Sequence, residues 1–89
     1  MKSTSYRQKK STIFKEIDGV IYILDHRTNT IHTLNTTASF LWRQLATPHT
    51  LQELCTLVCN TFAVEKRAAR QDIKEFLDLY RKRRFIVPT

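Results

Sequence analysis

Two short apolar runs and a helix start follow one another with little between them, and this order constrains the fold more than any other feature. Residues 20–24 form an unbroken apolar run rich in β-branched side chains, which is typical of a central strand. Asp18-Gly19 precedes that run and favours a tight hairpin turn, because a type I′ turn needs positive φ at both central residues. A polar turn over residues 25–30 leads to the second run, residues 31–34. With residues 13–17 as a first strand, the chain predicts a three-stranded antiparallel sheet.

Helical signals fill the chain after the sheet. Asn35 is a good N-cap, and the apolar residues behind it recur at helical spacing until Pro48 ends the helix. A capping box from Thr50 to Glu53 predicts the start of a second helix. A third helix is expected to begin between residues 64 and 69 and to end near residue 84, with residues 85–87 docked back on the sheet. The prediction is an α+β domain, a three-stranded antiparallel sheet followed by three helices, arranged like a winged helix-turn-helix.

The length and charge of the chain restrict its organisation and partners. Its 89 residues suffice for one domain, which we place at residues 12–89 behind a flexible basic arm at residues 1–11. The formal charge of +7 predicts attraction to an acidic partner. No apolar run approaches the roughly 20 residues of a membrane span, and no signal-peptide pattern opens the chain. We therefore expect a cytoplasmic protein without a membrane partner.

The sequence carries little that points to catalysis. The three histidines are scattered, without the spacing of a metal or nucleophile motif, and Gly19 as the sole glycine excludes a glycine-rich phosphate loop. Cys55 and Cys59 stand four apart in a helical pattern, which suits packing better than a disulfide or a four-ligand zinc site. We therefore expect no enzyme activity, no metal and no cofactor.

Peptide binding accounts for more features than any other function. The strand at residues 31–34 follows a hairpin and can lie at an edge of the sheet, where an extended peptide would add as a further strand. Ile73 and Leu77 could equally fill the core, whereas Phe76 and Tyr80 fit an apolar groove wall better. Arginines and lysines around such a groove would steer an acidic peptide toward it. The predicted peptide-binding residues are Ile31, His32, Thr33, Leu34, Arg67, Arg70, Ile73, Lys74, Phe76, Leu77, Tyr80 and Arg81.

A small winged-helix DNA-binding protein is the alternative. Most of the excess positive charge falls on the third helix, where a winged helix would carry its recognition surface. The charge is interleaved with acidic residues, however, and Gln71 is the one amide side chain within residues 65–84. A surface that reads bases usually holds more amide and hydroxyl groups. Nucleic acid is therefore the less favoured partner.

Several of these segments together resemble a known family. They are residues 23–25, residues 31–38 with Leu-Asn-x-x-Ala, Leu41-Trp42, residues 50–54, Asp72-Ile73 and Phe76-Leu77. In this combination the chain, over about residues 12–87, is similar to the PqqD-like family of leader-peptide recognition elements. That resemblance implies a non-catalytic protein that binds the leader segment of a ribosomally synthesised, post-translationally modified peptide.

The resemblance also implies a site and partners. The leader would pair with Ile31, His32, Thr33 and Leu34, in a cleft walled by Ile73, Phe76, Leu77 and Tyr80. A tailoring enzyme or leader peptidase of the same pathway would receive the peptide. The stand-alone form looks more like the proteins of lasso-peptide clusters, although a radical-enzyme pathway stays open, as does a homodimer. Arg84 departs from the family pattern, because members often place Gly at that helix end.

Overall fold

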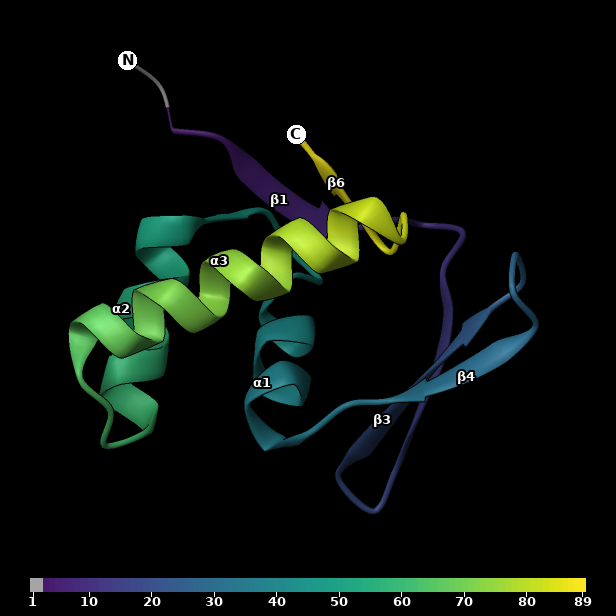
Figure 1. The fold of residues 1–89 in the computed structure, drawn as a ribbon, viewed down its shortest axis with the longest axis horizontal. Helices are drawn as coiled ribbons and strands as arrows, with labels where there is room; N and C mark the ends of the chain where they lie inside the picture. Colours follow the sequence, from purple (N-terminus) through teal and green to yellow (C-terminus); the bar gives the residue numbers. More distant parts are fainter. Residues whose placement is uncertain (1–2) are drawn as a thin grey trace.

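The computed structural model describes residues 3–89 as two small sheets and three helices (Figure 1). The sheet formed by strands within residues 13–33, the hairpin sheet, lies to one side of the helices, with α1 (Thr36–Gln44) beside it and α2 (Leu51–Thr61) farthest from it. The third helix crosses the others and ends near the chain's C-terminus. In chain order the elements are β1 Ser5–Gln8, β2 Ile13–Ile17, β3 Val20–Asp25, β4 Thr30–Thr33, α1 Thr36–Gln44, β5 His49–Thr50, α2 Leu51–Thr61, α3 Lys66–Lys82 and β6 Ile86–Pro88.

The predicted three-stranded sheet is confirmed as the antiparallel order β2-β3-β4. Asp18 and Gly19 both adopt positive φ, 51° and 81°, as the tight turn between β2 and β3 requires. Burial alternates along β3, so that Ile21 and Ile23 face the core while Tyr22 and Leu24 lie on the outer face. The register of the sheet therefore fixes which side of each strand meets the helices.

The three helices are confirmed, together with the caps that start two of them. The Asn35 side chain accepts a hydrogen bond from the amide of Ala38 at 2.8 Å, and Thr50 and Glu53 form a reciprocal capping box. Trp42 is fully buried at the centre of the core, where it packs against strand and helix side chains. The bidentate pair between Arg43 and Glu16, at 3.0 Å for both contacts, joins α1 to the hairpin.

The N-terminal segment differs from the expected flexible arm. Residues 5–8 form β1, which pairs with β5 on one side and with β6 on the other. The amide of Gln8 also donates to the Leu45 carbonyl at 2.7 Å. Backbone hydrogen bonds to two partner strands hold β1 in place. Its sequence is mostly polar and has no apolar alternation, so the strand could not be predicted from the sequence. Residues 1 and 2 of the expected arm lie outside the described residues.

The C-terminal tail docks as expected, although on β1 rather than on the hairpin sheet. Phe85 and Ile86 are buried. Arg84 takes the left-handed conformation, with φ of 64°. The amide of Phe85 donates to the Tyr80 carbonyl, and that of Arg84 donates to the Arg81 carbonyl, both at 2.9 Å. This is a Schellman motif with arginine where glycine is usual.

Candidate functional site

The outer edge of β4 is free in the described part of the chain. Strand β4 pairs with β3 alone, and the amide of Leu34 donates to the Ile21 carbonyl at 2.9 Å. Because hydrogen-bonded pairs alternate in an antiparallel ladder, His32 also points its backbone groups toward β3. The amides and carbonyls of Ile31 and Thr33 therefore point to the open edge, where an added strand could bind them.

A groove separates this edge from the C-terminal turns of α3. Its volume is about 290 Å³. Ile31 on the strand and Leu79 on the helix are strongly exposed, at 67% and 44%. An extended peptide on β4 would place alternate side chains against this helix wall. The groove is lined by Ile31, His32, Thr33, Leu79, Tyr80, Arg83 and Phe85.

The predicted helical wall lies mostly in the core instead. Ile73 is fully buried, and Phe76 and Leu77 are 9% and 4% exposed. Of the four predicted wall residues, only Tyr80 lines the groove, and it stacks on Phe76 with ring centroids 3.9 Å apart. The apolar stripe of α3 packs into the hydrophobic core, and this packing buries Ile73, Phe76 and Leu77. Leu34 is likewise 4% exposed and lies behind the edge.

The predicted basic rim lies on the other flank of α3. Arg81 lies over the Tyr6 ring on β1, 5.8 Å from its centroid. Arg70 lies near α2, where its charge partly opposes the burial that raises the pKa of the Cys55 thiol. Arg67 and Lys74 share that flank, because they lie at intervals of three, four and seven residues from Arg70 and Arg81. These four residues therefore do not border the groove at β4.

Three groove residues escaped the sequence reasoning. Leu79 falls outside the apolar stripe, and its isolation on a polar face was the available signal of a contact site. Phe85 reaches the groove through the Schellman motif, which packs it on Tyr80 with ring centroids 5.7 Å apart. Arg83 gave no signal, since its position depends on how α3 meets β4.

His32 lies in a polar cluster at the base of the groove. One Arg83 nitrogen, Nη1, lies 2.6 Å from Nδ1 and 2.9 Å from Nε2 of the His32 ring. His32 Nε2 is 3.8 Å from the Asp25 carboxylate, which is 7% exposed. Burial raises the Asp25 pKa, but hydrogen bonds from the Arg27 amide and the Thr28 side chain outweigh it and hold the pKa below its usual range.

Neither a metal cluster nor a membrane-spanning helix is found among the described residues. Within residues 3–89, no group of three or more His, Cys, Asp or Glu side chains could hold a metal ion. No helix there is long and apolar enough to cross a bilayer. Cys55 is buried and Cys59 half-buried, both as free thiols.

The fold and site define a small α+β domain in which the open edge of β4 lies beside a helix. Residues 21–86 match the family described as coenzyme PQQ synthesis protein D (PqqD). This span covers most of the chain, so the protein belongs to the PqqD family. No sequence among the curated proteins matches it.

Two solved structures share the fold. One is described as TbiB1 in complex with the TbiA(beta) leader peptide; it has a TM-score of 0.79 and 19% identity, over 90% of this chain and 93% of that one. The other is a lasso peptide synthetase B1 complexed with the leader peptide; its TM-score is 0.79 and its identity 20%, over 93% and 98% of the two chains.

Proposed function

We propose that this protein is a non-catalytic recognition element that binds the leader segment of a ribosomally synthesised precursor peptide. The observation that carries the proposal is the free edge of β4 beside the groove. Backbone groups of Ile31 and Thr33 would pair with the leader, and Leu79 and Tyr80 would contact its side chains. Each well-buried apolar side chain would contribute roughly 1.5–3 kcal/mol before entropy costs.

The comparisons support this function and suggest its pathway. Both similar solved structures are described as complexes with leader peptides. We infer a role in lasso-peptide biosynthesis or a related pathway, in which a leader peptidase or tailoring enzyme takes the bound peptide. We also place the protein in the cytoplasm, because its ligand would be a ribosomal product. The order of its elements supports a variant of the winged helix-turn-helix.

The DNA-binding alternative is not favoured. Acidic residues interrupt the basic sequence of α3, and Arg81 lies over the Tyr6 ring of β1. Fluorescence anisotropy would test both functions with two labelled probes. One is a synthetic leader from the short precursor gene expected beside this one, and the other is a random DNA duplex of equal charge.

The two functions predict different salt dependence. Leader binding with a Kd of about 1 μM or tighter, retained at physiological salt, would support the proposal. Salt-sensitive DNA binding without leader binding would contradict it, since phosphate contacts weaken steeply as salt rises.

A further inference from the structure

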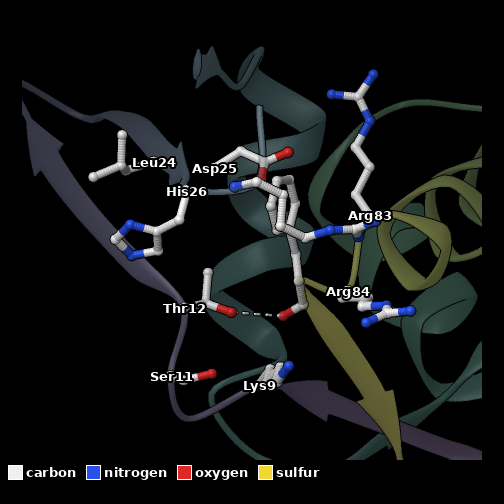
Figure 2. A pocket seen from close by; sticks show the side chains of 10 residues that line it. Lys9, Ser11, Thr12, Leu24, Asp25, His26, Arg83 and Arg84 are labelled. Atoms are coloured by element: carbon white, nitrogen blue, oxygen red, sulfur yellow. Dashed lines mark hydrogen bonds between the residues drawn. The ribbon is translucent and has the colours of Figure 1, made fainter. Parts of the chain in front are cut away.

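A second hollow, of about 150 Å³, adjoins the groove at the N-terminal end of β4 (Figure 2). Three separate connections meet there: β1 to β2, β3 to β4, and α3 to β6. Each contributes a cation, and we call this set, Lys9, Arg27, Arg83 and Arg84, the basic pocket. The volume equals about five waters, which suits the end group of one side chain.

The charge of the basic pocket is uncompensated. Within residues 3–89, Arg43 pairs with Glu16 and the His32 ring lies 3.8 Å from the Asp25 carboxylate, and neither contact includes a pocket cation. Asp25 also lines the hollow, but it accepts a hydrogen bond from the Arg27 amide at 3.0 Å and is nearly buried. Four cations against one engaged carboxylate leave a formal excess of three positive charges. Such a concave cluster attracts an anion.

The pocket continues the groove rather than standing apart from it. Arg83 and Phe85 line both hollows. A third hollow beside Thr30 and Lys82 also contains Arg83, together with Arg27. A strand paired with Ile31 and Thr33 would therefore pass Arg83 and reach the cations at the Thr30 end.

The backbone at Arg84 gives an independent reason to regard this side chain as special. Its left-handed φ of 64° is unfavourable for any residue with a Cβ, and glycine is usual at this step of a Schellman motif. Arginine there carries a backbone cost and adds a charge to the pocket. Strained residues of this kind cluster at ligand sites.

We infer that the basic pocket binds a carboxylate of the leader peptide, from an aspartate or glutamate next to the segment that pairs with β4. The inference rests on the proposed function and adds the substrate class: a leader with an acidic residue at one end of its binding segment. Charge-assisted hydrogen bonds from Lys9 and Arg84 would hold the carboxylate. The positive charge of Arg27 and Arg83 would attract it.

The test is a cycle of protein and peptide variants, measured by anisotropy at physiological salt. The protein variants are Lys9→Ala and Arg84→Ala. Lys10→Ala and Lys66→Ala each remove one exposed positive charge outside the pocket and serve as matched controls. The probes are the synthetic leader and a set of leaders in which each Asp or Glu is replaced singly by Asn or Gln.

The expected result is acid-specific coupling. Lys9→Ala and Arg84→Ala should each lower the affinity for the unmodified leader about fivefold to twentyfold. They should change the affinity for one particular amide-substituted leader less than twofold, and the controls should stay within twofold for every probe. Equal losses for all leaders, or equal losses in the controls, would overturn the inference while leaving leader binding intact.

Other outcomes separate the inference from the proposed function. If the unmodified protein does not bind the leader, the proposed function itself fails. The two variants could instead lower the affinity for the DNA duplex and show no coupling with any leader carboxylate. The pocket would then bind phosphate groups, and the inference would fail. Circular dichroism melting of each variant would confirm that the fold is retained.

Discussion

Arg83 at the end of α3 reaches across to His32 on β4, with one guanidinium nitrogen within 3 Å of both ring nitrogens. An arginine can only donate, so the ring must accept through an unprotonated nitrogen. His32 also packs on Phe85, with ring centroids 5.5 Å apart. This contact joins the two walls of the groove.

The Arg83–His32 contact should contribute measurably to stability. Single substitutions Arg83→Ala and His32→Ala and the double variant form a cycle, measured by urea unfolding. We expect a coupling energy of about 1 kcal/mol, the usual net value of a partly buried hydrogen bond. Additive losses would mean that the contact does not form in solution.

Thr33→Pro should abolish leader binding while the protein remains folded. The Thr33 amide points to the open edge, and proline removes it without breaking a bond to β3. Anisotropy measures binding, and thermal melting checks the fold. Thr33→Val keeps the amide and should bind within about threefold of the natural chain. A folded Thr33→Pro protein with normal affinity would show that the peptide does not use this amide.

Leu77 and Leu79 should respond in opposite ways to truncation. Leu79 is exposed at the groove, so Leu79→Ala should weaken leader binding about tenfold and leave stability nearly unchanged. Leu77 is buried, so Leu77→Ala should lower the free energy of unfolding by about 2–5 kcal/mol. Phe76 is also buried, so Phe76→Ala should likewise lower the free energy of unfolding. The same pair of assays, anisotropy and urea unfolding, separates the two roles.

Alkaline pH should destabilise the protein through Tyr80. Burial raises the pKa of this phenol above its ordinary value of 10.0, with the nearby charge of Arg83 opposing. A raised pKa means that the folded state holds the proton more tightly. Its contribution to stability is therefore complete below pH 10 and is lost as the pH rises through the folded-state value. Tyr80→Phe should lose less stability across that range in urea unfolding, and identical slopes would contradict the assignment.

Arg84→Gly should raise stability, since glycine removes the backbone cost of the left-handed conformation. We expect a gain of about 1 kcal/mol over Arg84→Ala, which loses the charge but keeps the strain. The substitution preserves both Schellman hydrogen bonds, because backbone groups make them. Equal melting temperatures for the two variants would show that the turn carries no strain.

Local signals predicted the elements, and long-range contacts decided the rest. The Asp18-Gly19 turn, the Asn35 cap and the Thr50 capping box each act within four residues, and all appear in the structure. Strand β1 could not be predicted, because its pairing depends on residues some 80 positions away. Its own side chains carry no alternation of apolar and polar residues.

The candidate site was predictable as a place but not as a set of side chains. The open edge at Ile31 and Thr33 follows from the order of the strands. The face that α3 presents to β4 depends on its rotation about its own axis, which core packing sets. That rotation buries Ile73 and Leu77, turns Arg81 toward Tyr6, and brings Leu79 and Arg83 to the groove. The periodicity of a sequence shows which residues share one face of a helix, but it does not show which element that face contacts.

The pairing of β1 with β6 has a consequence for how the protein is made. Tyr6 lies opposite Pro88, so the first strand stays without this partner until residue 88 has been synthesised. Phe85, which lines the groove, lies just before β6, and Lys9 lies just after β1. Contacts so distant in sequence form slowly and late. The ribosome must therefore release residues up to Phe85 before the groove is complete, and a nascent chain that lacks them should bind a leader peptide poorly.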